Sequence, residues 1–399
     1  MSEVVYLLGA GFNHSIVDPS WKVKPPLSRN FFQVLFGSDP EHHRLEGIRT
    51  RLFVDLLLEE IERYWHLDLN ALSVGSFDIE ECLTLLESLL DDNQNPERAL
   101  TLERSAFALR NLLLMHLAQL QRAGRTPTAE YFGKDVLDSR ADVITFNYDT
   151  LAEASIASVS GISKKFEPID TPRRAFEPFK NVVDSDLDAS FSRWNYALAY
   201  GVKFDEVRLP ISGIPPYIDG KRYYAHPENA LYRHNRILKL HGSIDWLRYA
   251  TPRVDPNDIK RRSEPQVPRI TLDRGANYWL GELPRRDDRL MEPVIIPPIL
   301  YKNFKHRPFP AIWAQAFDAL STCTKLIVVG YSFPPTDFRT RRLFLEAFSQ
   351  NRLKELIVVN PDTSIASTVE RLTCFDGTAL SCNTLTELYG APASWFEYE

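Results

Sequence analysis

The chain has 399 residues, of which 44% are hydrophobic and 25% are charged, and its formal net charge at pH 7 is −6. Its length predicts one enlarged domain or two, and its negative charge excludes a global basic field that would attract nucleic acid or membranes. No apolar run approaches the roughly 20 residues that cross a bilayer. The four cysteines include no Cys-x-x-Cys pair. We therefore expect neither a zinc ribbon nor a disulfide framework, and we expect a cytoplasmic protein with reduced thiols.

The first apolar run, Val4–Leu8, leads directly into Gly9-Ala10-Gly11-Phe12-Asn13. A buried strand followed by Gly-x-Gly predicts a tight turn that lets the backbone approach a phosphate, with the N–H groups of the next helix facing that anion. The third glycine of the dinucleotide-binding pattern is absent, because Asn13 and His14 follow. An ordinary strand-to-helix turn has the same short pattern, so the motif gains weight only from the strand ends further along the chain.

A helical insertion is expected over residues 30–135, between the first and second strands. Asp78-x-x-Glu81 predicts a capping box that opens a helix over Ile79–Leu90. A further helix is predicted over Pro96–Ala123, because proline suits the first helical turn. These amphipathic segments indicate core-facing helices.

Two more short strands end in polar residues, at Ala141–Asp149 and Ile237–Ser243. Between them, residues 160–235 lack periodicity and indicate an irregular insertion or lobe. Residues 250–292 are charged and proline-bearing, which indicates a loop or hairpin insertion. Val294–Pro298 is a further strand-like run.

The last hundred or so residues show a clear α/β alternation. Helices are predicted over Trp313–Leu320 and Phe338–Phe348, and strands over Lys325–Val329 and Leu356–Val359. The strands are continuously apolar rather than alternating, as expected of a parallel sheet covered on both faces. The predicted fold class is α/β, a Rossmann-like parallel sheet with helices on both faces and a large helical insertion, in one domain over residues 1–399.

Five predicted strand ends carry distinctive groups: Gly9–Asn13, Asn147–Asp149, His241–Ser243, Gly330–Ser332 and Asn360–Asp362. In an open parallel sheet, ligands bind outside the carboxyl ends of the strands. We therefore expect all five to converge on one crevice, and this coincidence is stronger than any single motif.

The residue types suggest which part of a nucleotide ligand each strand end would bind. Gly9–Asn13 suits a pyrophosphate, Gly330 permits close backbone approach, and Ser332 can donate to a phosphate or a ribose hydroxyl. Asn360 and Asp362 stand where a ribose hydroxyl or an adenine edge needs a polar partner.

Asn147, Asp149 and His241 form the chemical set. An amide can fix a water or a ribose, a carboxylate can stabilise developing positive charge, and an imidazole can take a proton near neutral pH. Each has a structural alternative: Asn147 as a helix cap, Asp149 as a partner of the helix dipole, and His241 as a satisfied turn histidine. Ser332 has the same ambiguity, since it precedes a proline-rich turn.

Several motifs together resemble the sirtuin superfamily. The matching stretches are Gly9-Ala10-Gly11, Thr145-x-Asn147-Tyr148-Asp149, Lys239-Leu240-His241-Gly242-Ser243 and Gly330-Tyr331-Ser332. The resemblance is closer to the bacterial sirtuin-like branch found in antiphage defence proteins, which Pro25-Pro26-Leu27 and Asp78-Ile79-Glu80-Glu81-x-Leu83 also resemble.

The resemblance implies a Rossmann-like domain that binds NAD+ as its substrate, with chemistry at the nicotinamide–ribose bond and no metal. By motif match, Asn147 and His241 would be the essential pair, and Asp149 is the third candidate catalytic residue. The residues that it assigns to NAD+ binding are Gly9, Ala10, Gly11, Phe12, Asn13, Asn147, Asp149, Gly330, Tyr331, Ser332 and Asn360.

Two departures from the protein-deacylating sirtuins matter. Those enzymes carry a four-cysteine zinc module, which Cys82, Cys323, Cys374 and Cys382 cannot form, and Asn13 replaces the usual serine of the first motif. The resemblance to the defence branch therefore implies an NAD+ glycohydrolase that releases nicotinamide and ADP-ribose and depletes the infected cell. The alternatives are an NAD-dependent deacylase without zinc, and a catalytically silent sensor of NAD+ or ADP-ribose that controls a partner.

The resemblance also implies partners. We expect a homo-oligomer and a partner protein such as a hexameric, helicase-like ATPase. Neither a membrane nor directly bound nucleic acid is expected.

Overall fold

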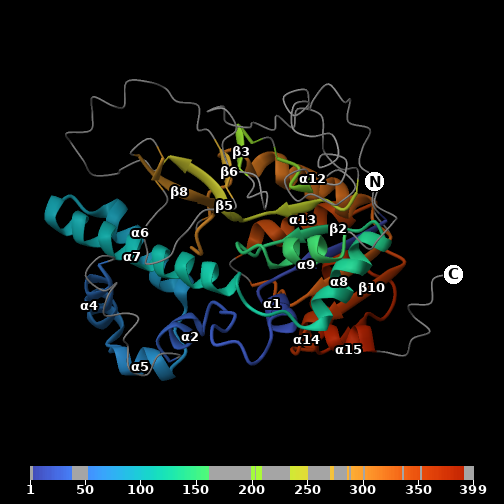
Figure 1. The fold of residues 1–399 in the computed structure, drawn as a ribbon, viewed down its shortest axis with the longest axis horizontal. Helices are drawn as coiled ribbons and strands as arrows, with labels where there is room; N and C mark the ends of the chain where they lie inside the picture. The colour runs from blue at the N-terminus through green and yellow to red at the C-terminus, as the bar shows by residue number, and fades with distance from the viewer. Residues whose placement is uncertain are drawn as a thin grey trace, which may run out of the picture.

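The computed structural model describes residues 3–37, 53–160, 199–202, 204–208, 234–249, 270–273, 285–286, 289–299, 302–334, 337–350 and 353–390. Figure 1 shows three parts: a parallel sheet with its helices, a helical module at one side, and a smaller second sheet. Most of the predicted insertions at 160–235 and 250–292 lie outside the described residues.

The parallel sheet contains six strands, in the order β11-β10-β9-β1-β2-β4. All neighbouring pairs are parallel. The strands are β1 (Val4–Leu8), β2 (Asp142–Thr145), β4 (Ile237–Lys239), β9 (Lys325–Val329), β10 (Glu355–Val359) and β11 (Leu380–Cys382). The apolar residues of the central strands are buried on both faces, which confirms the predicted α/β class.

Helices connect these strands on both faces of the sheet. They are α1 (Gly11–Ile16), α8 (Pro127–Asp138), α9 (Leu151–Val159), α12 (Phe309–Thr322), α13 (Phe338–Phe348), α14 (Ser364–Thr373) and α15 (Leu385–Gly390). Helix α8 contacts α1, α9 and α15, whereas α13 contacts α12 and α14.

The direction in which successive strands are added to the sheet reverses between β1 and β9. From β1 the chain proceeds to β2 and β4 on one side, and from β9 it proceeds to β10 and β11 on the other. Because parallel crossovers are right-handed, this reversal places the two groups of helices on opposite faces. Such a switch point is where open α/β sheets bind their ligands.

The helical module follows α1. Its helices are α2 (Phe31–Gly37), α4 (Val54–Trp65), α5 (Leu69–Val74), α6 (Ile79–Asp92) and α7 (Pro96–Leu120). Asn95 accepts hydrogen bonds from the first turn of α7, with Pro96 directly behind it. The module has a hydrophobic core of its own, which also takes in Ile244, Leu247 and Met291 from the second sheet.

The second sheet has the order β3-β6-β5-β8-β7, with β5 antiparallel to β8. Its strands are β3 (Glu206–Arg208), β5 (Gly242–Tyr249), β6 (Thr271–Asp273), β7 (Arg285–Arg286) and β8 (Arg289–Ile295). The predicted strand over Ile237–Ser243 is therefore wrong beyond Lys239. The chain turns at Leu240-His241, and Gly242 begins a strand of the second sheet.

The structure corrects the sequence predictions for the start of α6 and for the position of α8. Asp78 caps α6 through the Glu80 N–H, but Glu81 accepts from the Trp65 indole instead of closing a capping box. Helix α8, which the sequence places largely inside the insertion, packs against the parallel sheet. Within the described ranges, no helix has the length and apolar character to cross a membrane.

Candidate functional site

Three glycines meet where β1 and β9 end. Gly11 N donates to Gly330 O at 3.0 Å. A Cβ at Gly9 would lie 2.6 Å from Gly330 O, and one at Gly11 would lie 2.7 Å from Gly330 Cα. Gly330 itself has a φ of +62°, and its Cβ would lie 2.4 Å from the Gly11 carbonyl carbon. These glycines are required because two strand-end turns touch backbone to backbone at the switch point.

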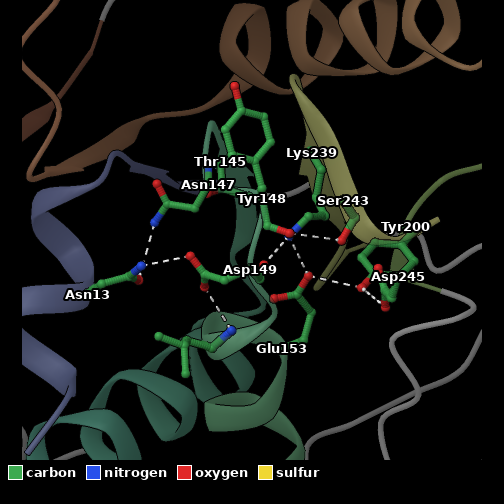
Figure 2. A network of polar contacts seen from close by, with 11 residues as sticks. Asn13, Thr145, Asn147, Tyr148, Asp149, Glu153, Tyr200, Lys239, Ser243 and Asp245 are labelled. Carbon is green, nitrogen blue, oxygen red and sulfur yellow. Dashed lines mark hydrogen bonds and ion pairs between the residues drawn. The ribbon is translucent and has the colours of Figure 1, made fainter. Parts of the chain in front are cut away.

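The turn after β2 meets the turn after β1 through side-chain amides. Asn13 Nδ2 donates to Asp149 Oδ2 at 2.7 Å, and Asn147 Nδ2 lies 3.3 Å from Asn13 Oδ1 and 3.1 Å from Gly9 O. Figure 2 shows Asn13 linked to both of the other side chains, with the Asn147 oxygen directed away from Asn13. Asn13 and Asp149 are buried, whereas Asn147 is half-buried and lies at the edge of the sheet.

Asp149 also supports the turn that carries it. Its Oδ1 accepts from Leu151 N at 3.0 Å, so it caps the start of α9. Burial raises the pKa of its carboxyl, and the nearby Lys239 charge and the hydrogen bond from Asn13 oppose that rise. The predicted catalytic Asp149 is thus enclosed by internal partners.

A buried ion pair lies behind this turn. Lys239 Nζ pairs with Glu153 Oε1 at 2.9 Å and also donates to Asp149 O, and neither charged side chain has any exposed area. Tyr200 donates to Glu153 at 3.0 Å. A buried charge is stable only when it is paired and hydrogen-bonded, and the contacts of this cluster link β4, α9 and the Asp149 turn (Figure 2).

His241 lies on the turn that joins the two sheets. The centroid of its ring lies 5.1 Å from that of Phe146 and 5.9 Å from that of Phe304. The ring also stacks on Tyr148, with a centroid distance of 6.3 Å. This apolar enclosure lowers the pKa of the imidazole to about 4, because burial disfavours the charged form. Its Nε2 has no hydrogen-bond partner within the described part of the chain. The ring is therefore neutral at pH 7, and its Nε2 can form a hydrogen bond with a ligand.

Asp337 is a site residue that the sequence reasoning missed. Its Oδ2 accepts from Tyr331 OH at 2.6 Å and lies 3.9 Å from His241 Nε2. The Tyr331 ring stacks on Phe146 at 4.1 Å. Asp337 immediately precedes α13 and follows the β9 turn closely in sequence, so an acidic residue opening the next helix was the available signal.

Lys302 and Glu80 also approach this region and were missed as site residues. Lys302 Nζ lies 3.5 Å from Glu80 Oε1. Glu80 comes from the helical module, and its carboxylate interacts electrostatically with Asp337 and with Tyr148. Glu80 belongs to a stretch that the family resemblance had singled out, and that was its signal.

The remaining predicted residues have varied surroundings. The Phe12 ring packs in the core with its centroid 4.7 Å from that of Phe132, and the Phe12 N–H donates to Gly9 O at 3.0 Å. Ala10 and Ser332 are exposed. Asn360 Nδ2 donates to Tyr331 O at 3.3 Å and its Oδ1 accepts from Asp362 N, so its amide supports the neighbouring turn.

The strand ends are thus linked in space. Hydrogen bonds connect Gly9, Asn13, Asn147 and Asp149, and ring contacts connect His241 through Phe146 to Tyr331. Among the described residues, no group of three or more His, Cys, Asp or Glu side chains is placed to hold a metal ion.

No family model and no curated protein matches the chain. It is similar to several solved structures. One, from work on the mechanism and regulation of Sir2 enzymes, has 12% identity and a TM-score of 0.37, with 98% of this chain and 90% of that chain covered. A Sir2 homologue–NAD complex has 12% identity and a TM-score of 0.37, with 94% and 89% covered.

A Sir2 homologue mutant in complex with 2′-O-acetyl ADP-ribose has 11% identity and a TM-score of 0.39, with 100% of this chain and 95% of that chain covered. At such low identities and TM-scores, the likeness assigns no ligand, activity or residue role. The class that the chain's own topology defines is an α/β protein with a Rossmann-like parallel sheet.

Proposed function

We propose that this chain is an NAD+ glycohydrolase, which cleaves the nicotinamide–ribose bond and releases nicotinamide and ADP-ribose. The observation that carries the proposal is the state of His241. It is a buried, neutral imidazole whose Nε2 lacks a partner among the described residues. It follows β4, and ring contacts through Phe146 connect it to Tyr331 after β9. A buried polar atom without a partner is costly unless something binds it.

The glycine turns suit the pyrophosphate of the dinucleotide. Gly9, Gly11 and Gly330 let the turns after β1 and β9 pack closely against each other. Ala10 and Ser332 are exposed beside them and could contact phosphate or ribose oxygens. The first helix after this turn is short, and the N–H groups of Gly11, Phe12 and Asn13 already donate to backbone carbonyls. We therefore attribute the phosphate contacts to the exposed residues Ala10 and Ser332.

The reaction adds water across the bond between ribose C1′ and the nicotinamide nitrogen. The C–N bond breaks and its electron pair leaves with nicotinamide. The oxocarbenium-like ribose takes the water oxygen, and one proton is released. Asn147 would hold a ribose hydroxyl or the water, and neutral His241 would accept the proton. Asp337, 3.9 Å from His241 Nε2, would stabilise the resulting imidazolium.

The biological setting is also part of the proposal. The motif resemblance supports a cytoplasmic, NAD-depleting effector in bacterial antiphage defence. The same resemblance supports a homo-oligomer and a partner protein such as a hexameric, helicase-like ATPase.

The test is NAD+ consumption by the purified protein, with nicotinamide and ADP-ribose resolved by chromatography. We expect equimolar products from the wild type and a rate at least about 100-fold lower for His241→Ala and Asn147→Ala. His306→Ala is the matched control, because His306 is exposed and lies outside the site. Full activity in both site variants would refute the assignment.

Two other outcomes separate the rival functions. Nicotinamide release that depends on an added acyl-lysine peptide would identify a deacylase. Tight NAD+ binding without turnover, with or without partner proteins, would identify a sensor.

A further inference from the structure

We propose that Asp149 acts as a positioning residue for Asn147, and that it acts through Asn13. In this arrangement a carboxylate and two amides in series fix the Asn147 side chain with its carbonyl oxygen toward the ligand. The proposal deepens the proposed function and relies on it for the identity of the ligand.

The series begins at a group whose polarity is fixed. An ionised carboxylate can only accept hydrogen bonds. Asp149 uses one oxygen for Leu151 N and the other for Asn13, so Asn13 must turn its NH₂ group toward Asp149. The oxygen of the Asn13 amide then faces Asn147.

The second amide is fixed from two sides. Asn13 Oδ1 and the Gly9 carbonyl are both acceptors, and both lie within 3.3 Å of Asn147 Nδ2. Two acceptors on one side require the NH₂ group of Asn147 on that side. The Asn147 oxygen must therefore point away from Asn13, as drawn in Figure 2.

The base of the series is held rigidly. Asp149 and Asn13 are buried, and Lys239 Nζ donates to the Asp149 carbonyl while it pairs with Glu153. Burial raises the pKa of the Asp149 carboxyl, and the Lys239 charge and the hydrogen bond from Asn13 oppose that rise. In this geometry both carboxyl oxygens accept hydrogen bonds, one from Leu151 N and the other from Asn13. Asp149 therefore never needs to contact the substrate.

The consequence for recognition is a preference for hydroxyl donors. A carbonyl oxygen accepts from a ribose hydroxyl or from water, whereas an NH₂ group in its place would only donate. Asn13 is essential to this outcome, because a serine hydroxyl can both donate and accept and would fix no polarity.

The test exchanges the two polar groups. In Asp149→Asn, the new NH₂ group must face either Leu151 N or Asn13. If it faces Asn13, the Asn13 amide must turn its oxygen toward residue 149 and its NH₂ group toward Asn147, and this reverses the orientation of both amides. In Asn13→Asp, two carboxylates oppose each other. The double variant N13D/D149N restores an acceptor opposite Asn147 and keeps the net charge.

The readout is the ratio of affinities for ADP-ribose and ADP, measured by calorimetry, together with kcat and KM for NAD+. ADP lacks the ribose that Asn147 would contact, so the ratio isolates that contact. We expect each single variant to lower the preference for ADP-ribose about tenfold while ADP affinity is retained, and N13D/D149N to restore it to within about threefold. Asp68→Asn, at the exposed cap of α5, is the matched control.

The outcomes are distinguishable. Equal losses for ADP and ADP-ribose, or a double variant no better than the singles, would overturn the positioning role even if NAD+ is hydrolysed. Absence of nucleotide binding by the wild type would refute the proposed function instead. The positioning role is then decided by thermal unfolding, where the double variant must exceed both singles in Tm.

Discussion

The titration of His241 is the sharpest quantitative consequence of the structure. Its surroundings lower the imidazole pKa from 6.5 to about 4, since burial and the Lys302 charge outweigh the attraction of Asp337. At about 1.4 kcal/mol for each pH unit, this amounts to about 3 kcal/mol in favour of the neutral ring. Replacing His241 with glutamine removes the titration and keeps a polar side chain.

The sign follows from proton binding in the two states. Between pH 6.5 and about 4, the unfolded chain binds a proton at His241 that the folded chain does not. The free energy of unfolding therefore falls as the pH falls through this window. Between pH 7 and pH 5 the wild type should lose about 2 kcal/mol more than His241→Gln, because this group alone distinguishes them.

Two measurements check this result. Urea unfolding of both proteins at pH 7 and pH 5 gives the difference in stability. Nuclear magnetic resonance of labelled imidazoles should show a ring that stays neutral to near pH 4 and is missing from His241→Gln. A His241 resonance that titrates between pH 6 and pH 7, or equal pH dependence of the two proteins, would refute the burial argument.

Three further substitutions test other parts of the site. Gly330→Ala should destabilise the fold by about 3 kcal/mol in chemical unfolding, through a positive φ and contacts near 2.4 Å; Gly390→Ala, where a Cβ would meet nothing within 4 Å, is the control. Lys239→Met should cost about 3–5 kcal/mol because it leaves Glu153 charged and unpaired, and adding Glu153→Gln should recover part of that loss. Asp337→Asn should lower the His241 pKa further in the same resonance experiment, since the carboxylate raises it; an unchanged pKa would contradict the pairing.

The sequence was sufficient for the parallel sheet because its signals are local. Lys325–Val329 and Phe338–Phe348 were predicted with their observed bounds. A continuous apolar run that ends in glycine or a polar residue reports a buried parallel strand without any knowledge of its neighbours. Chain direction then places all strand ends at one edge, and that geometry brought Gly9, Asn147 and Gly330 together.

The rest of the site depends on contacts distant in sequence. The sequence did not reveal that Leu240-His241 turns out of the sheet, because the turn is defined by pairing with β8: Ile296 N donates to His241 O at 2.8 Å. Asp337 became a site residue only through the fold of Tyr331 and His241 around it. The internal role of Asn13 was equally hidden, since its residue type suits an anion contact as well as an amide series.

The position of His241 connects the three parts of the molecule. Strand β4 of the parallel sheet leads into it, β5 of the second sheet leads away, and the segment after β8 holds its carbonyl. Tyr148, which stacks on its ring, donates to Ile296 O in that same segment. Strands β5 and β8 in turn contribute Leu247 and Met291 to the core of the helical module. The imidazole is therefore placed by tertiary packing on both sides, whereas the Asn147 amide is held by hydrogen bonds to Gly9 O and Asn13 Oδ1. The helical module also packs against Tyr148, which lies between Asn147 and Asp149, so a change in its packing would reach both His241 and this turn.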